Sequence, residues 1–283
     1  MKILLTGAKG QLGRCFQDRL PPEWEIQATD ADELDITDIE QVRQAVEQFQ
    51  PDTIVNAAAY TAVDKAESEP LLAELINVTG PANLATVAHE NKIRLVHVST
   101  DYVFDGKATH PYTENSPTNP LSVYGRTKLA GEQAVMKAAS DSIIVRTAWV
   151  FSEYGNNFVK TMIRLAKERD KLSIVSDQRG CPSYAGDIAL AIITLLQQQA
   201  EKGIYHYCGD EEVSWYEFTK VIFNIAKKKG VIKSIPSLAP ITTQQYPTPA
   251  NRPSYSSLNC SKIRKLNIVL SDWENRLKDI ITE

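Results

Sequence analysis

A tyrosine and a lysine four residues apart are the residues of this chain best suited to do chemistry. Tyr124 and Lys128 follow a run rich in Pro, Asn and Ser, and residues 129–139 are rich in Ala, Lys, Glu and Leu without proline, which predicts a helix. Positions i and i+4 of a helix lie on one face. We therefore expect the Lys128 ammonium to stabilise a tyrosinate at Tyr124 by lowering the pKa of the phenol. A tyrosine and a lysine at this spacing also occur together by chance. Whether the pair is functional therefore depends on the elements that position it.

A glycine-rich turn separates the first predicted strand from the first predicted helix. Residues 2–6 are an apolar run, Gly7, Gly10 and Gly13 follow, and residues 12–20 have a helical pattern that ends at two prolines. Glycines permit a tight turn, and the N-terminus of the following helix faces a pyrophosphate. The spacing is Gly-xx-Gly-xx-Gly rather than Gly-x-Gly-xx-Gly. Its position directly after a strand nevertheless predicts dinucleotide binding.

The second predicted strand, residues 25–30, ends in an acidic residue. Asp30 lies roughly twenty residues beyond the first glycines, where a carboxylate commonly accepts hydrogen bonds from ribose hydroxyls. An acid at this place disfavours a 2′-phosphate, so NAD(H) is the physical expectation. The alternative is a simple turn aspartate. Asp35 and Ile36 follow shortly afterwards, before a helix capped by Thr37 or Asp38.

Small and hydroxyl side chains follow the next two predicted strands. Residues 53–55 lead into Asn56 and the alanines 57–59, and residues 94–99 lead into Thr100. Three alanines leave room for a flat ligand against the backbone, although close packing between a helix and a strand explains them equally well. The crevice at the carboxyl ends of parallel strands is where open α/β sheets bind ligands.

The alternation of strands and helices predicts the α/β class, with a Rossmann-type doubly wound parallel sheet. We expect residues 1–150 to form a dinucleotide-binding domain, completed by part of 170–200. Residues 151–283 are then mainly a smaller α/β substrate-binding portion. Their polar loop 242–257 is long enough to be functional.

The composition excludes several classes of function. The chain has 283 residues, a hydrophobic content of 43% and a net charge of −4, which is typical of a globular protein and not of a nucleic-acid-binding one. No apolar run approaches the length of a membrane span, and the N-terminal apolar stretch is too short for a signal peptide. We therefore expect a cytoplasmic protein.

Several runs together resemble the dTDP-4-dehydrorhamnose reductases, a family of the extended short-chain dehydrogenase/reductases. They span nearly the whole chain: residues 6–13, 56–67, 98–106, 123–132, 146–150, 155–159 and 246–253. The resemblance implies NAD(P)H-dependent reduction of the 4-keto group of dTDP-4-dehydro-β-L-rhamnose to dTDP-L-rhamnose, the final step of dTDP-rhamnose biosynthesis. It also implies NADPH or NADH as cofactor, a dTDP-sugar as substrate, and a monomer or homodimer.

The resemblance further implies roles for individual residues. Tyr124 would protonate the sugar oxygen O4, Thr100 would hydrogen-bond the carbonyl oxygen, and Lys128 would lower the pKa of Tyr124 and bind the nicotinamide ribose. The positions that match cofactor-binding residues are Gly7, Gly10, Gln11, Leu12, Asp30, Asp35, Ile36, Ala57, Ala58, Ala59, Tyr60, Thr61, Val98, Tyr124 and Lys128. The positions that match substrate-binding residues are Thr100, Asp101, Tyr124, Trp149 and Arg252.

Some relatives are described as Mg²⁺-dependent dimers with an acidic residue early in the first helix. Residues 13–16 contain no acid here, so we expect no metal site. One alternative function is a nucleotide-sugar epimerase or dehydratase of the same superfamily, but dehydratases need an Asp-Glu pair that Thr100-Asp101-Tyr102 lacks. The other is a non-catalytic regulatory nucleotide-binding subunit, against which the intact Tyr124 and Lys128 pair argues.

Overall fold

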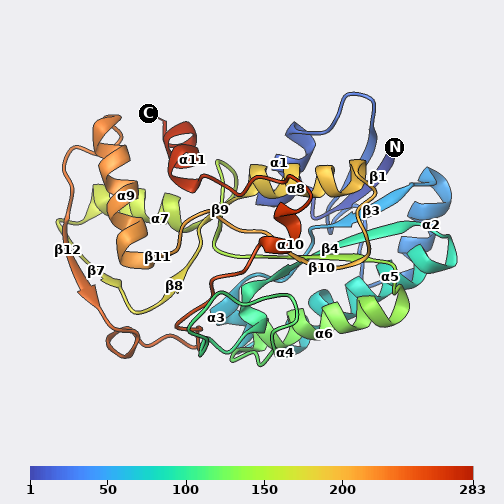
Figure 1. The fold of residues 1–283 in the computed structure, drawn as a ribbon, viewed down its shortest axis with the longest axis horizontal. Helices are drawn as coiled ribbons and strands as arrows, with labels where there is room; N and C mark the ends of the chain where they lie inside the picture. The colour runs from blue at the N-terminus through green and yellow to red at the C-terminus, as the bar shows by residue number, and fades with distance from the viewer. Residues whose placement is uncertain (283) are drawn as a thin grey trace.

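A six-stranded parallel sheet organises the computed structural model, which describes residues 1–282 (Figure 1). In spatial order the strands are β10 (Gly203–His206), β5 (Ile143–Thr147), β4 (Arg94–Thr100), β3 (Thr53–Asn56), β1 (Lys2–Thr6) and β2 (Glu25–Thr29). From β1 the chain moves outward to β2 and then returns to the other side of β1 as β3. This reversal opens a crevice at the carboxyl ends of β1 and β3.

Helices cover both faces of this sheet, as predicted (Figure 1). Along β1, Ile3 and Leu5 pack on one face together with α1 (Gln11–Asp18) and α8 (Ala185–Gln197), whereas Leu4 packs on the opposite face. The helices on that opposite face are α2 (Ile39–Phe49), α5 (Gly80–Glu90) and α6 (Val123–Ala138). Because successive strand residues point to opposite faces, a continuous apolar run is what a doubly covered strand requires.

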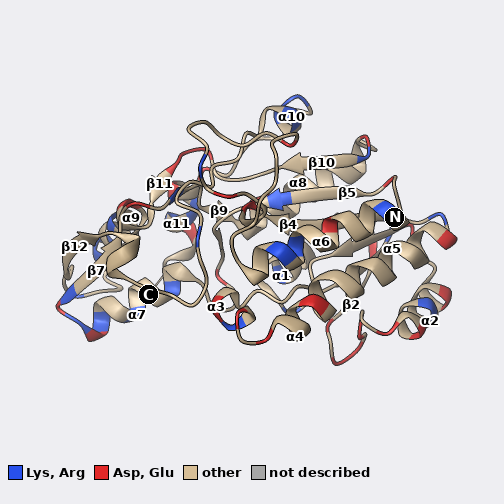
Figure 2. Cartoon of the chain, turned by 90° about the horizontal axis from the view of Figure 1, so that it is seen from below, with Lys and Arg blue, Asp and Glu red and all other residues tan. Residues whose placement is uncertain are grey.

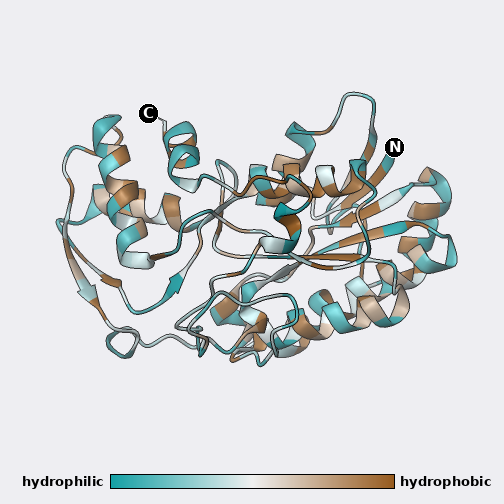
Figure 3. Ribbon diagram, viewed as in Figure 1, coloured by the Kyte–Doolittle hydropathy of each residue, from teal (hydrophilic) through white to brown (hydrophobic). Residues whose placement is uncertain are grey.

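A second group of elements lies at the other end of the molecule (Figure 1). It comprises α7 (Phe158–Glu168), α9 (Trp215–Lys228), α11 (Trp273–Ile280) and the parallel pair of β7 (Lys171–Val175) with β12 (Ser237–Ile241). Phe218 of α9 and Trp273 of α11 belong to its separate hydrophobic core. Along α9, hydrophobic residues alternate with hydrophilic ones (Figure 3), so one side of the helix packs on this core.

The helical segment 70–90 is interrupted. It consists of α4 (Pro70–Glu74), a π-helical segment η1 (Leu75–Thr79) and then α5. Pro81 lacks the N–H that would continue the hydrogen-bond ladder, and a Cβ on Gly80 would lie 2.5 Å from Ile36 Cδ1. The interruption is thus a π-helical turn that ends directly before Gly80 and Pro81.

Short elements connect these layers. They are α3 (Val63–Ala66), the 3₁₀ turn η2 (Asp101–Val103), β6 (Val150–Phe151), β8 (Arg179–Gly180), β9 (Ser183–Tyr184), β11 (Val213–Ser214), the 3₁₀ turn η3 (Thr243–Gln245) and α10 (Ser261–Arg264). The four strands predicted over residues 2–6, 25–30, 53–55 and 94–99 are confirmed to within a few residues. The sixth strand, β10, was not predicted, because residues 203–206 carry no distinctive pattern.

Acidic and basic residues are interspersed along the elements rather than segregated by sign (Figure 2). Within residues 1–282, no helix is long and apolar enough to cross a membrane. Over the same residues, no group of three or more His, Cys, Asp or Glu side chains is arranged to hold a metal ion.

Candidate active site

A cavity of about 960 Å³ opens at the carboxyl ends of the central strands. The structure brings most of the predicted site residues to it. The predicted cofactor positions that line it are Gly7, Gly10, Gln11, Leu12, Asp30, Asp35, Ile36, Ala57, Ala58, Ala59, Thr61, Val98, Tyr124 and Lys128. The predicted substrate positions that line it are Thr100, Asp101, Tyr124 and Trp149.

The glycine turn fits a dinucleotide. Gly7 has φ +71°, and a Cβ there would lie 2.6 Å from Ala58 N, while a Cβ on Gly13 would lie 2.2 Å from Gly7 O. Only glycine tolerates such contacts. Gly10 precedes α1 and supplies no side-chain cap, so the first N–H groups of the helix are left for a ligand at the cavity wall. These donors and the positive end of the helix dipole suit a pyrophosphate.

Asn56 fixes the run of alanines that forms another wall. Its Oδ1 accepts hydrogen bonds from Thr6 Oγ1 at 2.8 Å and from Ala58 N at 3.0 Å. Its Nδ2 lies 3.0 Å from His97 Nδ1, and burial lowers the pKa of His97 well below its usual value. The neutral imidazole therefore accepts from the amide, and the alanine backbone is tied to two neighbouring strands.

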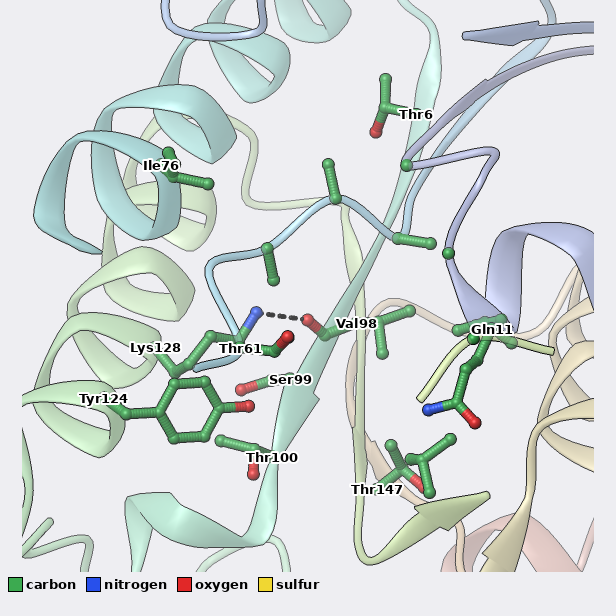
Figure 4. Close-up of a pocket in the computed structure, with 18 of the residues that line it drawn as sticks. Thr6, Gln11, Thr61, Ile76, Val98, Ser99, Thr100, Tyr124, Lys128 and Thr147 are labelled. Atoms are coloured by element: carbon green, nitrogen blue, oxygen red, sulfur yellow. Dashed lines mark hydrogen bonds between the residues drawn. The ribbon is translucent and has the colours of Figure 1, made fainter. Parts of the chain in front are cut away.

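Tyr124 lies in the first turn of α6, where Ser122 Oγ caps the helix by accepting from Gly125 N at 3.1 Å. Its ring packs edge-on against Tyr102 with the centroids 5.4 Å apart, and the phenol points towards Ser99 and Thr100 (Figure 4). Burial raises the pKa of Tyr124 to about 12, although the Thr100 hydroxyl opposes the rise. The phenol thus keeps its proton at neutral pH.

The Lys128 side chain is only 2% exposed, and its ammonium donates to Val98 O at 2.7 Å (Figure 4). Desolvation lowers the pKa of Lys128 to about 8. Burial, Thr100 and Asp101 are the groups that shift the pKa of Tyr124 in this structure, so the effect of Lys128 on that pKa stays a prediction. The helical spacing placed both groups on one face correctly, but the ammonium is directed at a carbonyl, and burial dominates the titration of the phenol.

Thr100 and Asp101 end β4 on the floor of the cavity. Thr100 Oγ1 donates to Asp101 Oδ1 at 3.0 Å and accepts from Tyr102 N at 3.2 Å. Burial raises the pKa of Asp101 to about 6, while hydrogen bonds from Ser256 and Thr100 oppose the rise. The Thr100 hydroxyl is thus held beside the Tyr124 phenol by short local contacts.

Two stacked indoles form the wall towards the second group of elements. Trp149 stacks on Trp215 with the centroids 3.4 Å apart and an interplanar angle of 2°. The Trp149 backbone has φ +46°, a region that a bulky residue rarely adopts. A Cβ on Gly180 would lie 2.6 Å from the Trp149 ring, and Trp215 Nε1 donates to Gln178 Oε1 at 3.2 Å. The stack and its neighbours hold Trp149 in this conformation.

Two predicted site residues do not line the cavity. The Tyr60 hydroxyl donates to Glu69 Oε2 at 2.7 Å. Arg252 donates to both oxygens of Asp64, at 3.0 and 2.8 Å. Both side chains were expected in the cavity. In the structure each one instead donates hydrogen bonds to a nearby carboxylate, Glu69 or Asp64. Arg252 instead ties the C-terminal loop to α3.

Further cavity residues were not predicted from the sequence. Gln11 Oε1 accepts hydrogen bonds from Ser152 Oγ and Asn157 Nδ2, both at 2.9 Å, so the glycine turn is bonded to the loop before α7. Asn157 belongs to a motif run that could have suggested it, but Trp215 had no such signal. The other unpredicted lining residues include Thr37, Val63, Leu72, Leu75, Ile76, Thr147, Ala148, Gly155 and Asn156.

Known proteins share this sequence and fold. A family model described as RmlD substrate binding domain matches residues 1–283. A dTDP-4-dehydrorhamnose reductase of Aggregatibacter actinomycetemcomitans is 45% identical, over 99% of this chain and 98% of that protein. Solved structures of dTDP-4-dehydrorhamnose reductases from Clostridium acetobutylicum and, in complex with NADP, from Bacillus anthracis are 41% and 40% identical. Both have a TM-score of 0.93 and align over 99% of this chain and 98% of their own. The chain therefore belongs to the RmlD family of dTDP-4-dehydrorhamnose reductases.

Proposed function

We propose that this protein reduces the 4-keto group of dTDP-4-dehydro-β-L-rhamnose to give dTDP-L-rhamnose, with NADPH or NADH as the reductant. The observation that carries the proposal is the convergence of the glycine turn, Thr100, Tyr124 and Lys128 on one cavity. Family membership over the full chain supports it. We propose that residues 1–150, together with α8 and β10, bind the cofactor, and that residues 151–283 mainly bind the sugar nucleotide.

The dihydronicotinamide ring, when bound, supplies the hydride to the ketone carbon. Negative charge then develops on O4, and the protein must supply a proton there. We assign this proton to the Tyr124 phenol, which stays protonated at neutral pH because burial raises its pKa to about 12. The Thr100 hydroxyl, which donates to Asp101 Oδ1 in this structure, would turn its one proton to the same sugar oxygen and stabilise the charge as it forms.

Lys128 has a positioning role in this proposal. Its ammonium, fixed by Val98 O at 2.7 Å, has donor capacity left for the hydroxyls of the nicotinamide ribose. The first N–H groups of α1 after Gly10, Asp30 and the alanine wall would hold the rest of the cofactor. Asp101 and Trp149 would contact the sugar, and Arg252 would keep the C-terminal loop in place.

The direct test is to mix the protein with dTDP-4-dehydrorhamnose and reduced cofactor, and to follow the absorbance of the reduced nicotinamide. We expect substrate-dependent oxidation with at least one of NADH and NADPH. Conversion of the sugar nucleotide without net oxidation would point to an epimerase or dehydratase. Binding of cofactor with no sugar chemistry would point to a regulatory subunit.

Trp215→Ala is expected to raise the KM for the sugar nucleotide by about tenfold, with a smaller effect on kcat. The stack on Trp149 is worth about 0.5–1.5 kcal/mol beyond its buried area, and its loss frees a backbone held at φ +46°. Steady-state kinetics measures the effect. Trp215→Phe should restore most of it, and Tyr216→Ala on the same turn should leave KM unchanged. An unaltered KM in Trp215→Ala would contradict this role for the stack.

A further inference from the structure

The first turn of α6, which carries Tyr124, is held by a carboxylate from a distant part of the chain. Glu67 Oε1 accepts a hydrogen bond from Val123 N at 2.8 Å, across 56 residues of sequence. Val123 is the first residue of α6, and the first N–H groups of a helix have no partner within it. Ser122 Oγ accepts from Gly125 N in the same turn. The turn is therefore capped twice, once by its own N-cap residue and once by Glu67.

The charge of Glu67 suits this position. α6 has no acidic residue in its own first turn, so a carboxylate from outside the helix meets the positive end of its dipole. Glu67 follows α3 directly, and α3 contacts α6. Ala66 of α3 belongs with Tyr124 to one small hydrophobic cluster, against which Val63 also packs. Glu67 thus reaches the N-terminus of α6 from an element that also packs with Tyr124.

α3 depends on the C-terminal loop for its own position. It has four residues and no side-chain cap at its N-terminus, and an isolated helix of this length is not stable in water. Asp64 of α3 accepts hydrogen bonds from both Nη atoms of Arg252, at 3.0 and 2.8 Å, and from Ala250 N at 3.2 Å. The C-terminal loop therefore anchors α3, and α3 in turn places Glu67.

A small displacement of the first turn of α6 would matter for proton transfer. Tyr124 directly follows Val123, and its phenol must come within about 3 Å of the oxygen that it protonates. A shift on the order of 1 Å at a reacting group can lower the rate about 10²-fold. Lys128 lies one turn further along α6, and its ammonium is held by Val98 O. Loss of the Glu67 carboxylate should therefore leave the cofactor side of the cavity in place.

We propose that Glu67 is a positioning residue for the reaction, because its cap on the first turn of α6 holds the Tyr124 phenol where proton transfer to the sugar requires it. The inference rests on the proposed function, in which Tyr124 is the proton donor. Glu67 is not among the residues that line the cavity, so it acts through the helix and not on the substrate. Its loss should lower kcat and leave the binding of both ligands nearly unchanged.

The test combines steady-state kinetics with hydrogen–deuterium exchange of the full chain. Glu67→Ala should lower kcat by about tenfold, with the KM for the sugar nucleotide and the Kd for reduced cofactor within about threefold of the unmodified values. Amide exchange in a peptide that covers residues 119–130 should become faster, because Val123 N loses its acceptor. Glu67→Gln keeps an acceptor oxygen and should restore kcat to within about threefold of the unmodified value.

A second variant tests the anchor of α3 while Glu67 stays in place. Asp64→Ala removes the partner of Arg252 and should lower kcat by about threefold through the same route. In the double variant with Glu67→Ala, the two losses should not add, because both changes act on one contact. Additive losses, or an unchanged kcat in Asp64→Ala, would overturn the route through α3.

Asp272→Ala is the matched control. It removes a carboxylate that caps α11 by accepting from Asn275 N at 3.1 Å, a similar contact on a helix that does not line the cavity. It should alter neither kcat nor exchange in residues 119–130. An unchanged kcat in Glu67→Ala, an equal loss in Asp272→Ala, or a loss without faster exchange would overturn the inference and leave the proposed function standing. Absence of turnover in the unmodified protein overturns both.

Discussion

Tyr124→Phe is expected to lower kcat by about 10²–10⁴-fold, the contribution of a positioned general acid. The substitution removes the proton donor and keeps the ring that packs against Tyr102. Because burial raises the pKa of Tyr124 to about 12, the phenol of the unmodified protein carries its proton throughout the neutral range. The measurement is kcat from the oxidation of reduced cofactor with saturating sugar nucleotide.

A binding measurement separates lost chemistry from lost structure. The Kd of Tyr124→Phe for reduced cofactor should stay within about threefold of the unmodified value, because the cofactor is held mainly by the glycine turn and strand ends. Tyr102→Phe is a matched control, since it removes a hydroxyl from the neighbouring ring that also lines the cavity. Near-normal turnover in Tyr124→Phe would remove Tyr124 from the role of proton donor.

A buried ion pair links α6 to the sheet behind the residues proposed to be catalytic. Arg146 donates to both oxygens of Glu132, at 2.9 and 2.6 Å, and both side chains are 3% exposed. Arg146 Nη1 also lies 3.4 Å from His206 Nε2, and burial lowers the pKa of His206 to about 3. The imidazole is therefore neutral, and the Arg146 charge is balanced mainly by Glu132, one helical turn beyond Lys128.

Glu132→Ala is expected to lower the free energy of unfolding by about 3–5 kcal/mol, because it leaves the Arg146 guanidinium buried without its counter-charge. Urea denaturation followed by circular dichroism measures the loss. Glu40→Ala, which removes an exposed partner of Arg43, is the control and should cost at most about 1 kcal/mol. A loss in Glu132→Ala no larger than in this control would show that the pair contributes little to stability.

The sequence predicted the layers of the fold because local patterns encode them. The apolar run of β1 and its glycine turn are found where expected, and Asp38 caps α2 by accepting from Glu40 N at 3.0 Å. β10 was not predicted because Gly203–His206 begins with a glycine, ends with a histidine and holds only two hydrophobic residues between them. Its identity as a strand comes from pairing with β5, a contact between segments far apart in the chain.

The errors in the predicted site also arise from contacts that local sequence patterns do not encode. Motif matching placed Tyr60 and Arg252 in the cavity. The motifs do not indicate that Glu69 and Asp64 accept hydrogen bonds from these two side chains. Trp215 was missed because an aromatic residue at the start of a helix has no distinctive signal until Trp149 stacks on it. Helical spacing likewise placed Lys128 near the phenol without revealing where its ammonium points.

The late position of α8 and β10 in the chain has a consequence for folding during synthesis. The face of the sheet that carries Ile3 and Leu5 is covered partly by Ile188 and Ile192 of α8, and the free edge of β5 is closed only by β10. A nascent chain that has emerged only as far as residue 150 therefore exposes apolar surface and an unpaired strand edge. Such intermediates are prone to aggregate. The half of the chain that we propose binds the cofactor thus completes its own fold only after much of the second half has been made.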